Sequence, residues 1–461
     1  MEKGTNPDWE QAFNRFEGVL ASGNEALRLE AITKLAHFTK RAPLSVLIRT
    51  VPILSKILEV GSSDYTRLVQ EASFNCLYRI ACRDEVELEK EIGKSSVIPL
   101  LFRLLPNSEN SFRRVLIKCL WSFVTFGDQN RVIIARNGGL ELIISLLNSS
   151  YDDNRVLLLE ILSGLVLLRE VRRFLASSNG LRFLVEAASF GSLISRERAC
   201  QAIGLLAVTR RARHLLVELG AIPVLVELFR VGDFRTKLVA GNSLGVISAH
   251  VDYIRPVGEA GAIPLYAELL QGPEHIGMEI AEDAFCILAV AEANAVLICQ
   301  HLVRILREGG DESKAAAADV LWGISGYKHS VPVVRISGAI PILVDLLTDE
   351  DDEVREKVSG AVAQLSYDDE NRAELADSGA IPILIEMLED ESEELRDNAA
   401  EALICFAEDP LLVDRVSEAM EVPSFQNMQN RLIHIRSSEE HMVRSMRRMI
   451  IEHLTWNPDL V

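Results

Sequence analysis

The chain has 461 residues, with 48 Lys and Arg against 67 Asp and Glu, and its net charge is −19. Residues 1–230 hold 30 basic and 25 acidic residues, a net of +5, whereas residues 231–461 hold 18 and 42, a net of −24. The second half would repel phosphate, so this balance argues against duplex nucleic acid as the main ligand. Apolar residues make up 48% and aromatic residues 6%, which favours a buried core of Leu, Ile, Val and Ala.

No basic and apolar leader is expected at the start of the chain, since residues 1–8 are polar. Residues 1–48 form a partial first unit, with helix-like patterns over Trp9–Leu20 and Leu27–Thr39. The longest apolar run, Val156–Leu168, is too short to cross a bilayer and predicts a buried helix instead. We therefore expect no transmembrane segment.

A tetrapeptide, Gly-Ala-Ile-Pro, recurs in the second half of the chain. Its copies begin at Gly220, Gly261, Gly338 and Gly379, with gaps of 41, 77 (41 plus 36) and 41 residues. Glycine tolerates the left-handed conformation that ends a helix, and proline suits the first turn of the next one. Each copy therefore predicts a short first helix, a corner, an apolar second helix and a third helix. Weaker corners are predicted nearer the N-terminus, at Gly138, Asn179, Ser96 and Thr50-Val51-Pro52.

Two units depart from this pattern. A shortened unit is predicted near residues 261–296, with the register kept by Leu302–Leu306 and the usual corner replaced by Leu297–Gln300. At the end of the chain, residues 420–461 are more polar, and a helix is predicted at about 437–454 with Arg444, Arg447 and Arg448 beside apolar residues. A solenoid needs a terminal unit with a polar outer face, so we interpret this segment as the cap. A basic amphipathic helix for a membrane surface or a partner is the alternative.

Three helices in about 41 residues are typical of the armadillo class of repeat. The chain resembles armadillo repeat proteins, most clearly over residues 220–419, and specifically the repeat region of plant U-box armadillo proteins. This resemblance implies an all-α superhelix of about eleven three-helix units. The domains are then a capping unit at 1–48, repeats at 49–419 and a degenerate cap at 420–461.

The resemblance also implies that third helices line a concave groove. Importin-α proteins of this class place there a Trp and, four residues later, an Asn that hold a basic peptide. The equivalent positions carry two tryptophans, Trp121 and Trp322, but no Trp–Asn pair, which disfavours a conventional nuclear-import adaptor. Each tryptophan either packs between neighbouring helices or anchors a partner.

Carboxylates recur about one and two turns before the Trp position. Like charges four residues apart, as in Glu279/Asp283 and Asp397/Glu401, destabilise a helix unless a cation is near. They are either a solvated face or an acidic groove for a partner that carries Lys or Arg. The predicted groove comprises Trp121, Glu197, Gln201, Asn242, Glu279, Asp283, Asp319, Trp322, Glu356, Asp397 and Glu401.

Motifs for catalysis are weak. A Gly-x-Ser-x-Gly occurs at Gly241–Gly245, but it falls in a predicted third helix, whereas a nucleophile elbow follows a strand. Glu282 and Asp283 are candidates for an acid/base pair by residue type alone. We expect them to lie on an exposed helix face, which would leave their pKa values unshifted. The seven cysteines lack metal spacing and are expected to be buried thiols in a reducing compartment. We predict no enzyme, no cofactor and no metal.

Basic clusters in the first half have two interpretations. They either mimic a nuclear-localisation patch or, more simply, lie on exposed first helices and loop ends, where arginine stems cover apolar neighbours. The clusters are Arg113, Arg114 and Lys118; Arg169, Arg172 and Arg173; and Arg210, Arg211 and Arg213.

The sequence favours a non-catalytic scaffold or adaptor that binds an extended or helical segment of a partner protein, basic segments included. We expect it in the cytoplasm or nucleus. The alternatives are a substrate-recognition subunit of a ubiquitin ligase, although no U-box-like segment is present, and an unconventional nuclear transport adaptor. Affinity capture of ligase or nuclear-pore components would separate them.

Overall fold

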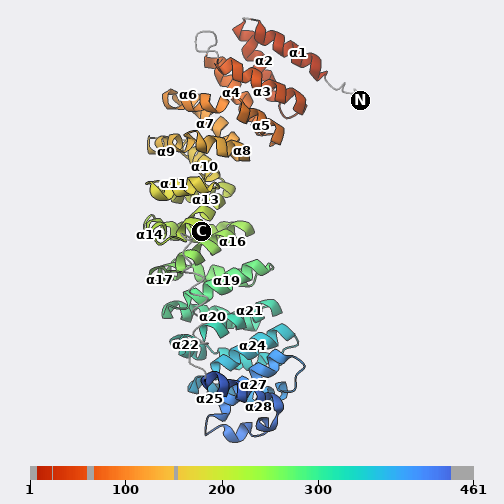
Figure 1. Cartoon of the computed structure of the whole chain (residues 1–461), viewed down its shortest axis with the longest axis vertical. Helices are drawn as coiled ribbons and strands as arrows, with labels where there is room; N and C mark the ends of the chain where they lie inside the picture. The colour runs from red at the N-terminus through yellow and green to blue at the C-terminus, as the bar shows by residue number, and fades with distance from the viewer. Residues whose placement is uncertain (1–7, 23, 60–66, 150–153, 438–461) are drawn as a thin grey trace. The chain divides into compact units, whose positions relative to one another are not determined.

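The computed structural model describes residues 8–22, 24–59, 67–149 and 154–437. These residues form 28 α-helices and three short 3₁₀ helices, with no strand among them (Figure 1). The expected all-helical architecture is therefore confirmed. The chain divides into two compact units, residues 1–206 and 207–461. The predicted helix at about 437–454 lies mostly outside the described residues.

The first unit begins with two pairs of helices, followed by three-helix sets. The pairs are α1 (Trp9–Ala21) with α2 (Glu25–Phe38) and α3 (Leu44–Glu59) with α4 (Arg67–Ala81). The sets are α5 (Val86–Lys94), α6 (Val97–Leu104) and α7 (Asn110–Thr125); α8 (Asp128–Arg136), α9 (Gly139–Ser149) and α10 (Arg155–Leu165); and α11 (Arg169–Ser177), α12 (Leu181–Ser189) and α13 (Leu193–Ala207).

The second unit continues the same pattern. It contains α14 (Arg210–Glu218), α15 (Ala221–Val231) and α16 (Phe234–Ser248); α17 (Val251–Glu259), α18 (Ala262–Leu270) and α19 (His275–Leu288); and the pair α20 (Glu292–Glu308) and α21 (Asp311–Ile324). Next come α22 (Ser330–Ile336), α23 (Ala339–Leu346) and α24 (Asp352–Leu365); α25 (Asp369–Asp377), α26 (Ala380–Met387) and α27 (Glu393–Ala407); and, after η2 (Val413–Val416) and η3 (Ala419–Glu421), α28 (Pro423–Ser437).

The glycine corners have the predicted conformation. Gly220, Gly261, Gly338 and Gly379 have φ between +74° and +90°, and each is followed at once by a second helix. Gly138 is also left-handed, with φ +85°. The local sequence therefore determines where the first helix ends and the second begins.

Two predicted corners are absent. Residues 44–59 form one helix, α3, which continues through Pro52. The shortening expected near residues 261–296 falls later, in α20, where first and second helices have merged into a single 17-residue helix. Residues 261–288 instead hold an ordinary second and third helix. In both places every residue keeps helical backbone angles, so the hydrogen-bond ladder continues; at Ser95 and Ser178, by contrast, an extended serine ends the first helix without a left-handed glycine.

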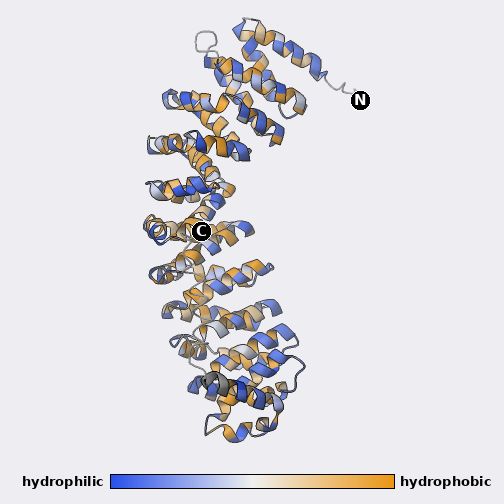
Figure 2. Ribbon diagram, in the orientation of Figure 1, coloured by the Kyte–Doolittle hydropathy of each residue, from blue (hydrophilic) through white to orange (hydrophobic). Residues whose placement is uncertain are grey.

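Third helices stack in a row within each unit, and this row positions the candidate site. In the second unit α16 contacts α19, α19 contacts α21, α21 contacts α24, and α24 contacts α27. The labels of these helices follow one edge of Figure 1, opposite the first helices α14, α17, α22 and α25. Helices throughout carry both apolar and polar residues (Figure 2), and the apolar ones supply the core.

Among the described residues, no single helix has the length and apolarity needed to cross a bilayer; the bent pair α8 and α9 meets that criterion together, by length and composition alone. Five of the seven cysteines are buried as expected, whereas Cys82 is exposed and Cys286 is partly so.

Candidate functional site

A row of carboxylates runs across four neighbouring third helices of the second unit. We call it the acidic row. It consists of Glu279, Glu282 and Asp283 on α19, Asp319 on α21, Glu356 on α24, and Asp397 and Glu401 on α27. Glu279 and Asp283 are exposed, and the other five are partly buried. Six of these seven residues were predicted as groove residues, and the sequence named the seventh, Glu282, only as half of an acidic pair.

One ammonium group lies in the first part of the row. Nζ of Lys357, on α24, is 3.0 Å from Oδ1 of Asp319. Glu282 forms no salt bridge to Lys or Arg within the described part of the chain, and burial followed by repulsion from Asp319 raises its pKa to about 7. Burial and Glu279 also raise the pKa of Asp283. The expectation of unshifted pKa values was therefore wrong, because side-chain position within the stack, rather than the helix face alone, determines desolvation.

The second part of the row is also rich in negative charge. Burial and the neighbouring Glu394 raise the pKa of Glu356. Arg431, on α28, places a guanidinium nitrogen 2.5 Å from Oδ2 of Asp397. The hydroxyl of Tyr367 donates a hydrogen bond of 2.5 Å to Glu401. Within the described residues, Lys357 and Arg431 therefore reach the row at Asp319 and Asp397, His275 lies 3.5 Å from Glu279, and the other carboxylates of the row form no ion pair with Lys or Arg.

Trp322 stands in the middle of this surface. It is 44% exposed and lies against Gly360 on α24. A β-carbon at Gly360 would sit 3.6 Å from Cδ2 of Trp322 and 3.7 Å from Nδ2 of Asn398 on α27. The glycine therefore brings the backbone of α24 close to an exposed indole and an amide.

Trp121 has a different environment. It belongs to the first unit, is partly buried, and its Nε1 donates to Oε2 of Glu160 at 2.6 Å. Its ring also meets Phe126 edge-on at 5.8 Å. These contacts connect α7 to α10, and they favour the packing interpretation for Trp121. Trp322 is the tryptophan that leaves its ring open to a partner.

The other predicted groove residues are Glu197 and Gln201 on α13 and Asn242 on α16. Gln201 and Asn242 are exposed, and Glu197 is partly buried. Ser243, within the Gly-x-Ser-x-Gly, lies inside α16, where its hydroxyl donates to the carbonyl of Val239 at 2.7 Å. This position confirms the helical assignment and leaves the serine without the setting of a nucleophile elbow.

Arginines at a fixed spacing perform a structural role that the sequence interpretation missed. Arg213 is only 7% exposed, and its Nε donates to the carbonyl of Ala207 at 2.7 Å. Equivalent bonds run from Arg131 to Val124, from Arg172 to Val166 and from Arg372 to Ser366. Each caps carbonyls near the end of a third helix. The predicted exposure of Arg213 was wrong, and the 41-residue spacing of 131, 172 and 213 was the available signal.

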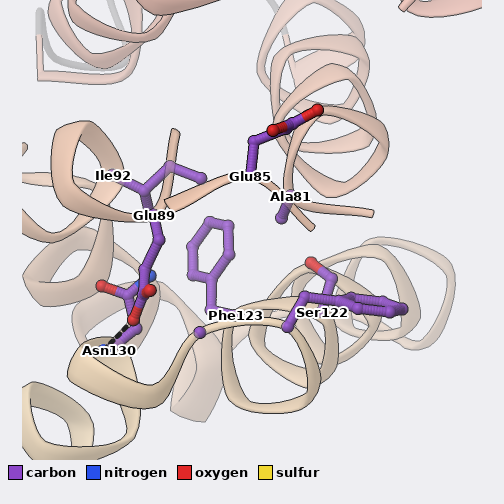
Figure 3. Close-up of a pocket in the computed structure, with 9 residues that line it drawn as sticks. Ala81, Glu85, Glu89, Ile92, Ser122, Phe123 and Asn130 are labelled. Atoms are coloured by element: carbon purple, nitrogen blue, oxygen red, sulfur yellow. Dashed lines mark hydrogen bonds between the residues drawn. The ribbon is translucent and has the colours of Figure 1, made fainter. Parts of the chain in front are cut away.

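A small cavity lies in the first unit between α5, α7 and α8 (Figure 3). The ring of Phe123 projects between Ile92 and Ala81, and the backbone N–H of Asn130 donates to Oε1 of Glu89 at 3.3 Å. The volume is about 10 Å³, which is room for one water molecule at most. It is too small for an organic ligand.

Comparison with known proteins supports the fold. A family model for HEAT repeats matches residues 299–404, the region that begins in the merged helix α20. No curated protein matches the chain. Among solved structures, an engineered protein aligns with a TM-score of 0.61 at 22% identity, covering 86% of this chain and 98% of that one. A designed armadillo repeat protein in complex with the peptide (KR)4 aligns with a TM-score of 0.41 at 23% identity, covering 49% and 99%.

The chain is thus an all-helical repeat solenoid of the armadillo and HEAT type. Repeats of this type have two or three helices per unit, and both kinds occur here: α20–α21 is a pair, and α25–α27 is a triple. The likeness to plant U-box armadillo proteins is not shown by these findings.

Proposed function

We propose that the chain is a non-catalytic scaffold that binds a partner protein along the third helices of its second unit. The occupant is an extended or helical segment that carries Lys or Arg side chains. One observation supports this most: among the described residues, Lys and Arg side chains neutralise the acidic row only in part. Carboxylates brought together in this way raise one another's pKa values, and an external cation relieves that repulsion.

Trp322 adds a second kind of contact. A guanidinium or ammonium group over an indole face gains about 0.5–1 kcal/mol at an exposed site. Trp322 shares α21 with Asp319, and Gly360, against which the ring lies, shares α24 with Glu356, so we propose that a single basic side chain meets the indole and a carboxylate together. Contacts repeated on successive helices add up along an extended segment.

The ends of the array belong to the same proposal. Residues 49–419 are the repeats, with 1–48 and 420–461 as caps. Phe425 and Met428 of α28 are buried, and α28 packs on α27, which supports a capping role for 423–437.

We place the protein in the cytoplasm or nucleus, where free thiols persist. A ubiquitin-ligase or nuclear-transport role would use the same surface, and no residue favours either one.

The test is binding of a fluorescent, N-acetylated peptide of alternating Lys and Arg, measured by anisotropy. The variant carries Asp283→Lys, Asp319→Lys and Glu401→Lys. Exposed charge pairs contribute about 0.2–1 kcal/mol each, and reversal adds repulsion of similar size, so we expect the three changes together to lower the affinity about eightfold or more.

A matched control carries Glu268→Lys, Glu308→Lys and Glu386→Lys. These exposed residues lie on α18, α20 and α26, outside the third helices, and their reversal changes the net charge equally. If both variants lose the same affinity, the peptide senses only the overall charge and the groove assignment fails.

A further inference from the structure

The last described helix, α28, already places one basic side chain on the face formed by the third helices. Nη1 of Arg431 lies 2.5 Å from Oδ2 of Asp397 on α27. α28 packs on α27 and buries Phe425 and Met428, which fixes Arg431 in this position. The described chain ends at Ser437, six residues beyond a side chain that is bound to the acidic row.

The sequence that follows contains the densest basic cluster in the second half of the chain. Arg444, Arg447 and Arg448 lie within five positions, and no other five-residue window of residues 231–461 holds three Lys or Arg. Residues 441–451 contain no Asp or Glu. The charge of this cluster is therefore complementary to that of the acidic row.

The cluster is also near enough along the chain to reach the row. Arg444 lies seven positions beyond Ser437, and seven residues span up to about 23 Å when extended and about 10 Å when helical. Neighbouring helices pack about 8–10 Å apart, so α24 and α21 lie about one and two such spacings from α27. Both conformations reach Glu356 on α24, and the extended one also reaches the exposed ring of Trp322 on α21.

We propose that residues 441–451 bind the third-helix face of their own second unit, over the acidic row and Trp322, and so regulate access to it. The proposal rests on the proposed function, because this segment and a partner compete for the same surface. The guanidinium groups of Arg444, Arg447 and Arg448 continue the series of contacts that Arg431 begins. Binding is non-covalent, so a partner displaces the segment by competition.

Attachment to the same chain makes a weak contact sufficient. A segment on a short flexible linker has an effective concentration of about 1 mM at its site. When its own Kd is about 0.1–0.3 mM, the occupied form exceeds the open form about three- to tenfold. The apparent affinity of a competing peptide then falls about four- to elevenfold, because only the open fraction can bind it.

The experiment uses the full chain and the N-acetylated Lys/Arg peptide described above, with Kd measured by anisotropy. The variant carries Arg444→Gln, Arg447→Gln and Arg448→Gln. It should bind the peptide about three- to tenfold more tightly than the parent protein, because the competing segment has lost its charge. A Kd equal to that of the parent protein overturns the inference.

A matched control carries Arg211→Gln, Arg304→Gln and Arg307→Gln. These exposed residues lie on α14 and α20, outside the third helices, and their replacement changes the net charge equally. The control should keep the Kd of the parent protein. If both variants gain the same affinity, the peptide responds to net charge alone and the inference is overturned.

A second measurement observes the segment directly. A fluorescent, N-acetylated peptide of residues 438–454 should bind the Arg444, Arg447 and Arg448 variant with a Kd of about 0.1–0.3 mM, the range assumed above. Addition of Asp283→Lys, Asp319→Lys and Glu401→Lys to that variant should weaken this binding. Absence of binding at a peptide concentration of about 1 mM overturns the inference, since attachment then provides too little occupancy.

Sedimentation identifies the copy that supplies the segment. The parent protein should be a monomer, as should the Arg444, Arg447 and Arg448 variant. A parent dimer that becomes a monomer in this variant means that a second copy fills the row, and this overturns the intramolecular contact.

Two outcomes separate this inference from the proposed function. Lys/Arg peptide binding that is weakened by the reversal of Asp283, Asp319 and Glu401, yet equal in the parent protein and the arginine variant, overturns the inference and leaves the proposed function in place. No peptide binding by either protein removes both.

Discussion

Replacing Gly379 by alanine tests whether left-handed corners hold the repeats in shape. Gly379 has φ +90° and ψ 20°, and a β-carbon there would meet no atom within 4 Å. Crowding therefore contributes nothing, and the cost is that of the backbone conformation alone. For a residue with a β-carbon this is about 1–2 kcal/mol.

Gly245 offers a matched control. It lies within α16, in right-handed helix, and an added β-carbon again meets nothing within 4 Å. Alanine there should stabilise the protein by about 0.5–1 kcal/mol, because glycine inside a helix loses more backbone freedom on folding. Gly379→Ala and Gly245→Ala are the same chemical change with opposite expected signs, and their stabilities should differ by about 2 kcal/mol.

Urea unfolding followed by far-ultraviolet circular dichroism measures both variants. They belong to the same unit, so the same transition reports on each. Equal shifts of the midpoint, or a stabilised Gly379→Ala protein, would show that the corner conformation is not under the strain described here.

Three further predictions concern single side chains. Arg213→Met leaves the carbonyl of Ala207 without its buried donor and should lower the free energy of unfolding by about 1–3 kcal/mol, measured by thermal denaturation. Because the folded-state pKa of Glu282 is raised, the stability that its carboxyl group contributes is lost as pH rises from about 4.5 to about 7. Glu282→Gln should therefore be more stable than the parent protein at pH 8, by about 1–2 kcal/mol after discounting for partial exposure. This advantage should disappear toward pH 5. Trp322→Ala should weaken binding of the Lys/Arg peptide about two- to fivefold with little change in stability, whereas Trp121→Ala should mainly lower the melting temperature. The reverse pattern would exchange their roles.

The sequence predicts features that short segments determine. A glycine before Ala-Ile-Pro predicts a corner because the preference for left-handed φ belongs to that residue, and Gly220, Gly261, Gly338 and Gly379 all confirm it. The merging of helices in α20 was harder to predict: the missing glycine was visible, but a substitute corner was assumed where the helix simply continues.

Features that depend on contacts between repeats were less predictable. The pKa of Glu282 depends on Asp319 and Lys357, which lie 37 and 75 positions further along the chain, and spacing alone does not say how deep each side chain sits. Arg213 was assigned to the surface because arginine usually lies there, although the third-helix carbonyls it caps lie only six positions before it. The acidic positions themselves were found from the repeat register, because one register position recurs on the same face of successive helices.

The location of a bound peptide tests the central claim most directly. A Lys/Arg peptide that carries a photoreactive group can be crosslinked to the full chain, and the modified residues identified by mass spectrometry. Crosslinks on α19, α21, α24 and α27 around Trp322 are predicted. Crosslinks confined to the second helices α18, α23 and α26 would contradict the claim that the third-helix face is the binding surface.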